Sequence, residues 1–434
     1  MPVYRKVLYS LMAFAVAVAV FFGGFWTAKL TADKDLKELE FILSTYKKNY
    51  YDIDDEKDIV GLFADELLKD DKYSEYYTKE EYAEIKSQDA GNREGVGVAL
   101  NADGKIVTVI GNSSAYKAGV KENGMITGVK AVDAAKFTKV NGDDEIGNEF
   151  NKFKPEEEFV IEVSYGAEKA AYNVKRSAYL QTYVKYYSDS GEYAFLSDDG
   201  KTVEFSRRGD NARYPLNGSE NAKIAVIDYD GFSGNGAGLT GSVGQFEKAL
   251  EKFKEEGKET LIVDLRNNGG GFVNIMLSVA SMLTTERNGE KLVGMVVKES
   301  GGNTESYSMP KACGQKYGIK NVIFLANGGS ASASEALMGC MLDYDTDSSV
   351  RVILEKSVDI TGETVYKTYG KGIMQTTFTS LTGSALKLTT AKLFFPVSGK
   401  CIHGVGLTPA LDERVIAETE QGCFNDALNI FAAK

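Results

Sequence analysis

The feature that most constrains the fold is an alternation of strand-like and helical segments from residue 223 onward. The runs "KIAVIDYD", "TLIVDLR", "KLVGMVVK" and "VIFLA" have the character of strands, and helical patterns lie over 241–256, 272–285 and after Ser332. Strands that alternate with helices in this way predict an α/β core. The end of the chain, from about residue 351, is again rich in strand patterns.

Two of these strands run into glycine-rich turns. The turns are "NNGGG" at 267–271 and "NGGSASASE" at 327–335, and a helix follows the second one. Glycines let backbone N–H groups face a ligand, and a serine at a helix start lies near the positive end of the helix dipole. These features suit an oxyanion hole beside a nucleophile, with Ser330, Ser332 and Ser334 as candidates. Spacing does not choose among the three serines, and each motif taken alone is more commonly a helix cap or a plain turn.

A nucleophilic serine needs a base, and the chain offers two kinds. His403 is the only histidine, and Lys371 lies between two glycines in "TYGKGIMQT". A lysine base must be neutral, which requires a pKa lower by about three units, or roughly 4 kcal/mol. Burial and the helix dipole can supply that shift. If the segment is a strand, Gln375 lies on the same face as Lys371 and can orient its amine.

Composition excludes several other kinds of site. A single histidine excludes multi-histidine metal centres, and four cysteines without CxxC spacing argue against zinc and redox motifs. We therefore expect neither a metal nor a cofactor. The net charge of -12 and the absence of a basic cluster argue against nucleic-acid binding. The pattern of cysteines does not assign a disulfide.

The amino terminus carries an apolar run. Residues 7–26 contain no charge and follow Arg5 and Lys6. Twenty such residues can cross a bilayer once, and the basic flank predicts that the rest of the chain lies on the extracytoplasmic side. The alternatives are a cleaved signal peptide and a buried core helix. The length of the run and the absence of a clear A-x-A site favour an uncleaved anchor over residues 1–33.

The remaining segments complete a multidomain chain of mixed α+β and α/β class. Residues 34–90 have helical patterns, and residues 91–176 have short strands with one or two small helices, which predicts a compact module. Residues 177–222 are polar and tyrosine-rich, and we expect them to form an inserted β segment. The catalytic core is expected over 223–434.

Read together, these pieces resemble the carboxy-terminal (tail-specific) processing proteases, which are PDZ-containing peptidases with a Ser-Lys dyad. The resemblance covers nearly all of the chain after the anchor, and its strength lies in six motifs in the family's order. They are "DDKYSEYYTKEEY" (70–82), "GVGVALNADGKIVTVIGNSSAYKAGV" (95–120), "IVDLRNNGGG" (262–271), "GGSASASEA" (328–336), "YGKGIMQT" (369–376) and "LKLTTAKLFFPVSGKCIHGVGLTP" (386–409).

The resemblance implies a role for each catalytic group. It makes Ser332 the nucleophile, Lys371 the base, and Gln375 the glutamine that accompanies the base. The chain between the serine and the lysine is longer than in typical members, so Lys356 and Lys367 are rival bases. Neither rival lies in the G-K-G-x-x-Q setting of the family.

The resemblance also implies where the oxyanion is bound. The donors would be the N–H of Ala333 and a glycine N–H in the preceding turn, Gly270 rather than Gly271. His403 falls in a segment in which the family has no catalytic residue, so it is expected to be structural or exposed.

The PDZ-like module implies the class of substrate. Gly95, Val96, Gly97 and Val98 would form the loop that captures the terminal carboxylate of an added strand, so the expected partners are proteins with exposed apolar carboxy-terminal tails. The family's glycine-aspartate turn is replaced by "NGM" at 123–125, a departure that bears on tail binding. The alternative function is a catalytically silent scaffold that binds tails. We favour an enzyme because the three catalytic residues are all present. The sequence names no regulatory partner.

Overall fold

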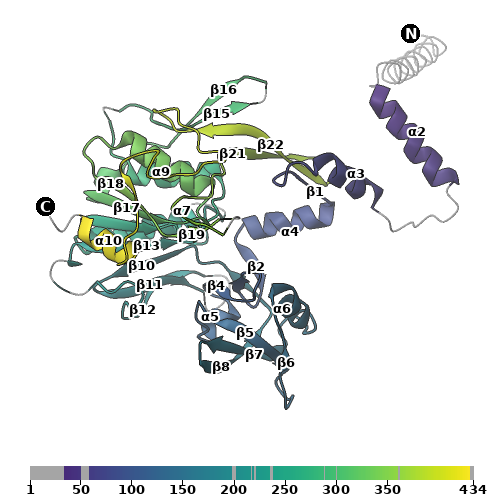
Figure 1. Cartoon of the computed structure of the whole chain (residues 1–434), viewed down its shortest axis with the longest axis horizontal. Coiled ribbons are helices and arrows are strands. Elements are labelled where there is room, and N and C mark those ends of the chain that lie inside the picture. The colour runs from purple at the N-terminus through teal and green to yellow at the C-terminus, as the bar shows by residue number, and fades with distance from the viewer. Residues whose placement is uncertain are drawn as a thin grey trace, which may run out of the picture. The chain divides into compact units, whose positions relative to one another are not determined.

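The computed structural model of the chain describes residues 34–49, 58–197, 202–216, 218, 221–234, 238–287, 289–299, 301–359 and 362–430. The chain divides into two compact units, Met1–Phe63 and Ala64–Lys434 (Figure 1). The apolar run predicted to cross a membrane, residues 7–26, lies outside the described residues. Among the helices that are described, none is both long and apolar enough to span a bilayer.

The first described elements are helical. Helix α2 (Lys34–Asn49) buries none of its residues, and α3 (Ile59–Leu68) contains the boundary between the two units. A short strand, β1 (Glu75–Tyr77), then leads to α4 (Lys79–Asp89). The predicted capping of α4 is confirmed: Thr78 N–H donates to Glu81 Oε2 (2.8 Å), and Glu81 N–H donates to Thr78 Oγ1 (3.3 Å).

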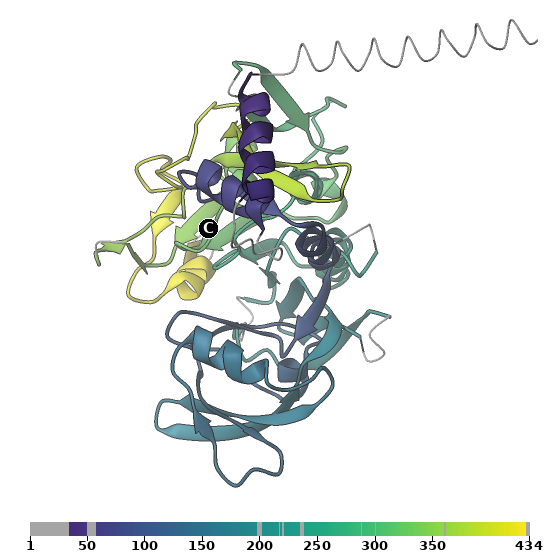
Figure 2. The same cartoon turned by 90° about the vertical axis from the view of Figure 1, so that its right-hand side faces the viewer.

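A β-rich module follows, with a hydrophobic core of its own (Figure 2). Its sheet has the order β6-β5-β7-β8, beside the hairpin β3–β4, and the pair β2–β9 closes it. Its elements are β2 (Asn92–Gly95), β3 (Val98–Leu100), β4 (Ile106–Val109), α5 (Ser114–Lys117), β5 (Met125–Ala131), β6 (Thr138–Lys139), α6 (Asp143–Phe150), β7 (Glu158–Tyr165), β8 (Glu168–Lys175) and β9 (Ser177–Leu180). Ile106, Ile146, Phe159 and Ile161 are fully buried at its centre.

The core of the second unit is an eight-stranded sheet of order β12-β11-β10-β13-β14-β17-β18-β23. The last five strands in this order are parallel, as the α/β prediction requires. They are β13 (Ile224–Tyr229), β14 (Thr260–Asp264), β17 (Asn321–Ala326), β18 (Val350–Leu354) and β23 (Val415–Ala417).

Helices cover both faces of this sheet. The cluster on one face contains residues of α7 (Ser242–Glu255), α8 (Val273–Leu283) and α9 (Ala333–Tyr344), and the cluster on the other contains α10 (Cys423–Ile430). Alternate strand residues divide between the clusters: Leu261 belongs to the first and Ile262 to the second. The mixed α/β core inferred from the sequence is therefore confirmed.

The segment 177–222 differs from the expected separate insertion. Its strands β10 (Val184–Ser188), β11 (Gly191–Leu196) and β12 (Glu204–Gly209) form one end of the core sheet, because β10 pairs antiparallel with β13. Tyr186 and Phe195 are fully buried in the main hydrophobic cluster. The tyrosine-rich composition serves burial here, and β10, β11 and β12 are continuous with the core, whereas β9 pairs with β2 in the module.

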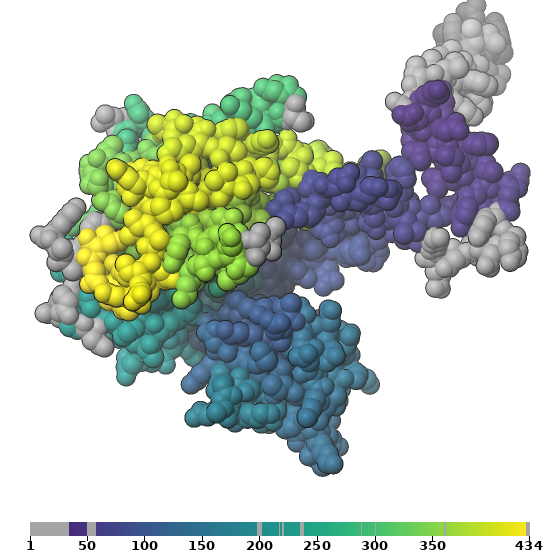
Figure 3. Space-filling model, viewed as in Figure 1, coloured from purple at the N-terminus to yellow at the C-terminus, as the bar shows by residue number. Residues whose placement is uncertain are grey.

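A second sheet contains the strand-rich end of the chain. Its path is β1-β22-β15-β16, and β21 pairs with β22 as well. The strands are β15 (Val293–Glu299), β16 (Thr304–Ser308), β21 (Ile373–Thr379) and β22 (Ala385–Phe394), and a small pair, β19 (Ser357–Val358) and β20 (Thr364–Val365), lies apart. The surfaces of the core and the module are shown in Figure 3.

Candidate active site

The two glycine-rich turns predicted to lie together do meet. Strands β14 and β17 are parallel neighbours, so the turns that follow them lie at the same edge of the sheet. Ser330 Oγ donates to the carbonyl of Leu265 (2.7 Å), and Ser334 Oγ donates to the carbonyl of Asn268 (2.9 Å). Both serines are fully buried. Their hydroxyls therefore tie one turn to the other.

Ser332 differs from its two neighbours in its backbone. It has φ 56° and ψ -112°, a combination that residues with a side chain rarely adopt. Such strain costs about 1–3 kcal/mol and persists where the surrounding structure enforces it, often at functional sites. Ser332 also precedes the first residue of α9, at the positive end of that helix. Among the three serines, Ser332 alone is held on a strained turn between a strand and a helix.

Gly270 lies directly against this serine. Its φ is 100°, and a Cβ at this position would lie 2.7 Å from the carbonyl oxygen of Ala331 and 2.8 Å from the nitrogen of Ala333. Only glycine fits such a position. The N–H of Gly270 donates to Asn268 Oδ1 (2.9 Å) in this conformation. The N–H of Ala333 belongs to the first turn of α9, where N–H groups have no acceptor within the helix.

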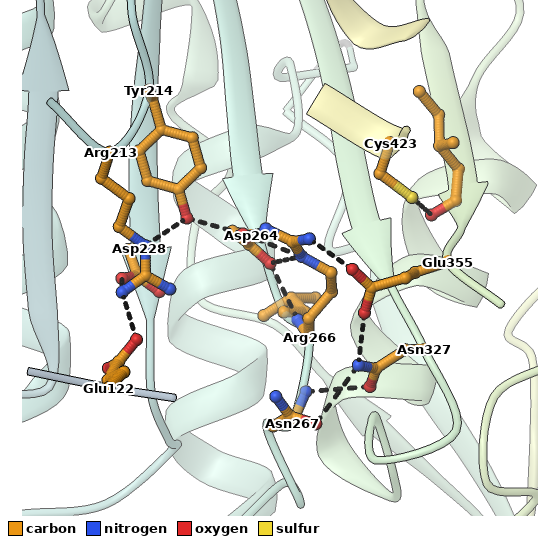
Figure 4. Close-up of polar contacts among 12 residues, drawn as sticks. Glu122, Arg213, Tyr214, Asp228, Asp264, Arg266, Asn267, Asn327, Glu355 and Cys423 are labelled. Carbon is orange, nitrogen blue, oxygen red and sulfur yellow. Dashed lines mark hydrogen bonds and ion pairs between the residues drawn. The ribbon is translucent and has the colours of Figure 1, made fainter. Parts of the chain in front are cut away.

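A charged network fixes the two turns from the side of the sheet (Figure 4). The guanidinium of Arg266 binds Asp264 and also donates to Glu355 (2.7 Å). Glu355 accepts from the amide of Asn327 (2.9 Å), whose oxygen accepts the N–H of Asn267 (3.0 Å). Burial raises the pKa of Asp264, but its bonds to Arg266 outweigh this and hold the pKa below its usual value. Asp264 therefore stays charged and keeps both turns in place.

Glu335 joins the serine to the segment that contains the predicted base. One oxygen of its fully buried carboxylate accepts the N–H groups of Ser332 and of Lys371, each at 2.9 Å. The other oxygen accepts the N–H of Gly370 (2.8 Å) and the hydroxyl of Thr368. The sequence analysis missed this residue. A glutamate three residues after a helix-initial serine is the capping-box pattern, and this pattern could have identified Glu335 from the sequence.

Lys371 lies in the loop before β21, and its side chain is half-buried. Burial lowers the pKa of Lys371, and the charge of Lys387 lowers it further. The amine lies over the ring of Tyr73, 4.9 Å from the ring centroid. Within the described part of the chain, no hydrogen bond joins this amine to Ser332. Ser332 and Lys371 therefore line the same cavity without a direct hydrogen bond between them.

Gln375 does not follow the expected strand alternation. Strand β21 begins only at Ile373, and a bulge between Met374 and Gln375 interrupts its register against β22. Because Lys371 precedes this strand and the bulge lies between Lys371 and Gln375, even spacing does not establish that the two residues share a strand face. The amide of Gln375 donates to Thr389 Oγ1 (3.2 Å) rather than to the amine of Lys371.

The predicted catalytic residues line one cavity of about 900 Å³. Ser332, Ala333, Gly270, Lys371 and Gln375 all contribute to it. Much of the remaining wall is apolar, and includes Met276, Leu277, Met295, Ile373 and Leu393. This combination of an apolar wall with a few polar groups is typical of a ligand site.

Several sequence candidates lie outside this cavity. The rival bases Lys356 and Lys367 do not line it, and neither does His403, which is exposed. A lysine that the sequence analysis did not consider, Lys387, does line it. The thiols of the four cysteines are free, so no disulfide joins them.

The loop Gly95–Val98 lies in the module and joins the last residue of β2 to the first residue of β3. The carbonyl of Val96 accepts the N–H of Ala115 (2.9 Å), and the carbonyl of Gly97 accepts the N–H of Ile110 (3.0 Å). Gly97 has φ 89°, and a Cβ there would lie 1.9 Å from Ser113 Cβ. The loop is therefore held tightly against the start of α5 with both of these carbonyls engaged.

The chain is similar to known serine proteases. Residues 223–412 match the profile of peptidase family S41. A probable CtpA-like serine protease of Staphylococcus saprophyticus is 26% identical over 397 residues, which cover 88% of this chain and 67% of that protein. A protein of the same description from Staphylococcus haemolyticus is 27% identical over 389 residues, 88% of this chain and 65% of that protein. The chain thus spans about two thirds of the length of these relatives.

Among solved structures, a photosystem II D1 C-terminal processing protease aligns with 90% of this chain and 89% of its own, at 18% identity and a TM-score of 0.48.

Proposed function

We propose that this chain, whose residues 223–412 match the profile of peptidase family S41, is a serine endopeptidase that processes or degrades proteins near their carboxyl termini. In this proposal Ser332 is the nucleophile and Lys371 the general base. The observation that carries it is the strained backbone of Ser332 beside Gly270, with the hydroxyls of Ser330 and Ser334 already engaged.

The reaction would be acyl transfer. Neutral Lys371 takes the proton of Ser332 as the serine oxygen attacks the peptide carbonyl. Lys371 then gives this proton to the leaving amine. Water then attacks the acyl-enzyme while Lys371 again takes and returns a proton, and the product acid leaves Ser332. The lowered pKa of Lys371, caused first by burial and then by Lys387, supports this role because it favours the neutral amine.

The oxyanion would be stabilised by backbone N–H groups. The N–H of Ala333 is the better placed of the two candidates, since it belongs to the first turn of α9. The N–H of Gly270 is bonded to Asn268 at rest, so it would have to exchange that acceptor for the substrate oxygen. Gly270 also contributes by lacking a side chain that would fill the oxyanion position.

The β-rich module would act as a PDZ-like receptor for the substrate tail. An extended apolar carboxy terminus would add beside the module, with its carboxylate at the loop Gly95–Val98. The carbonyls of Val96 and Gly97 support this, because both accept hydrogen bonds within the module and neither is an unpaired acceptor that would repel an incoming carboxylate.

We further infer that the chain is anchored in a membrane by residues 7–26, with its catalytic part on the extracytoplasmic side. The support is the uncharged length of this run and the basic pair that precedes it, Arg5 and Lys6.

The test uses the full-length chain in detergent and a substrate protein with an unstructured apolar tail. We expect Ser332→Ala and Lys371→Ala each to reduce cleavage by about 10⁴-fold or more. Lys356→Ala and Lys367→Ala are the matched controls and should leave cleavage unchanged. Cleavage that persists without Ser332 or Lys371 would sink the mechanism, and tail binding without any cleavage by the wild type would favour a silent scaffold.

A further inference from the structure

The segment that precedes β1 is fixed against the second sheet. Ser74 Oγ accepts the N–H of Thr389 on β22 (3.0 Å) and donates to Asp71 Oδ2 (2.6 Å). Tyr73 N–H donates to the other oxygen of Asp71 (3.0 Å). These bonds hold the side chain of Tyr73 beside the loop that contains Lys371.

Tyr73 contacts that loop at two places. Its ring faces the amine of Lys371, with Nζ 4.9 Å from the centroid, and its hydroxyl donates to the hydroxyl of Tyr369 (3.4 Å). Lys72 Nζ also lies over the Tyr73 ring, 5.0 Å from the centroid, and donates to the Tyr369 hydroxyl (3.0 Å). The segment therefore contacts both the side chain of Lys371 and a residue two positions before it.

The face of an aromatic ring attracts an ammonium group but has no such attraction for a neutral amine. A general base must be neutral when it takes a proton. The contact with Tyr73 therefore favours the form of Lys371 that cannot accept the proton of Ser332, and favours it in the described arrangement, in which no hydrogen bond joins the amine to that serine.

We propose that Tyr73 is a positioning residue for Lys371: its ring holds the charged amine at rest, and the amine serves Ser332 after it has released its proton to solvent and left the ring. This inference rests on the roles proposed for Ser332 and Lys371. The catalytic cycle then contains an additional step, because the attraction between the Tyr73 ring and the Lys371 ammonium has to be overcome before Lys371 takes the proton of Ser332.

Other charged and titratable groups also face the amine. Lys387, from β22, disfavours the charged amine, whereas Asp71, Tyr369 and Glu335 favour it. Burial and Lys387 outweigh these groups, so the pKa of Lys371 lies below its ordinary value. Removing the ring while keeping an apolar side chain should lower this pKa further, since burial is retained and one source of attraction is lost.

The direct experiment measures the protonation of Lys371 without using activity. The full-length wild type, Tyr73→Leu and Tyr73→Phe are each labelled with a trace of an amine-reactive reagent across a range of pH. Mass spectrometry then follows the labelling of Lys371, with exposed Lys356 as internal reference. We expect Tyr73→Leu to lower the pKa of Lys371 by about half a unit to one unit, and Tyr73→Phe to leave it unchanged.

Kinetics provide a second readout. On the acid limb of the kcat/KM profile, the same shift raises the rate of Tyr73→Leu by about 3–10-fold, while Tyr73→Phe follows the wild type. Identical pKa values for Lys371 in the wild type and Tyr73→Leu would overturn the proposal. If Tyr73→Leu fails to fold, Tyr73→Met supplies an apolar side chain without a ring, and the same criterion applies.

The labelling also separates this inference from the proposed function. In Ser332→Ala the contact between ring and amine remains, so the effect of Tyr73→Leu on labelling should persist. If Ser332→Ala retains cleavage, the proposed mechanism fails, whereas the Tyr73 contact is judged by labelling alone.

Discussion

The two sides of the active site are built differently. The serine side consists of two turns at the edge of a buried sheet, and the hydroxyls of Ser330 and Ser334 are bonded and fully buried there. The lysine side is a loop of the second sheet, and the half-buried amine of Lys371 lies on an aromatic ring. Glu335 spans both sides, since it binds the backbone N–H of the serine and of the lysine.

This difference indicates how each group is prepared for catalysis. The position of Ser332, the proposed nucleophile, is set by backbone geometry, so a single added atom can destroy it. The protonation state of Lys371, the proposed base, is set by burial and by the charges around it, so substitutions of its neighbours should shift a pH profile rather than abolish activity. The following predictions test this contrast.

The largest effect is expected from Gly270→Ala. The new Cβ would lie within 3 Å of three atoms of the chain and would meet the N–H of Ala333, besides forcing alanine to a φ of 100°. We expect kcat/KM to fall by about 10³-fold, because an oxyanion donor is blocked. The control is Gly269→Ala, where a Cβ would have no neighbour within 4 Å. Equal activities for the two variants would show that the serine side tolerates an added atom, and would contradict the view that backbone geometry fixes the position of Ser332.

Glu335→Gln should have the next largest effect, because it affects the connection between the two sides. An amide places a donor against backbone N–H groups that need an acceptor, in a fully buried position. We expect a loss of about 10²-fold in kcat/KM and of about 3 kcal/mol in the free energy of unfolding.

Two measurements distinguish positioning from simple stabilisation by Glu335. Thermal unfolding gives the fraction of folded protein, and the rate at which a phosphonylating reagent modifies Ser332 reports the geometry of the nucleophile. Glu413→Gln, at an exposed position, serves as the control. A destabilised variant whose folded fraction keeps full activity would reduce Glu335 to a structural role.

The parts of the molecule that could be predicted from sequence are those set by local patterns. The alternation after residue 223, the capping box at Thr78 and the helix after Ser332 each follow from residues close together in the chain. The strained backbone of Ser332 could not be inferred, because glycine turns allow many conformations and the surrounding sheet selects one.

Contacts between distant residues explain most of what was missed. The bond from Glu335 to Lys371 spans 36 positions, and the placement of 177–222 depends on pairing between β10 and β13. The bulge before Gln375 arises from the register between two strands, which neither strand encodes alone. The family resemblance implies that Lys371 is the base, but it could not say that the amine of Lys371 lies over the ring of Tyr73.

The smallest effect is expected from Lys387→Gln, and it should appear only as a shift in pH dependence. Lys387 lies near Lys371, and its charge lowers the pKa of Lys371. Its removal raises that pKa, so a higher pH is needed to obtain the neutral base. The acid limb of kcat/KM should therefore move to higher pH by about half a unit, with the plateau retained.

The direction of this shift makes the test specific. Tyr73→Leu should move the same limb to lower pH, so the two variants displace it in opposite directions although both lie beside the same amine. Lys392→Gln removes an exposed lysine of the same strand that does not line the cavity, and it should leave the limb in place. A shift of the Lys387→Gln profile to lower pH, or a loss of the plateau, would mean that Lys387 contacts the substrate. The lysine side would then depend on fixed geometry, as the serine side does.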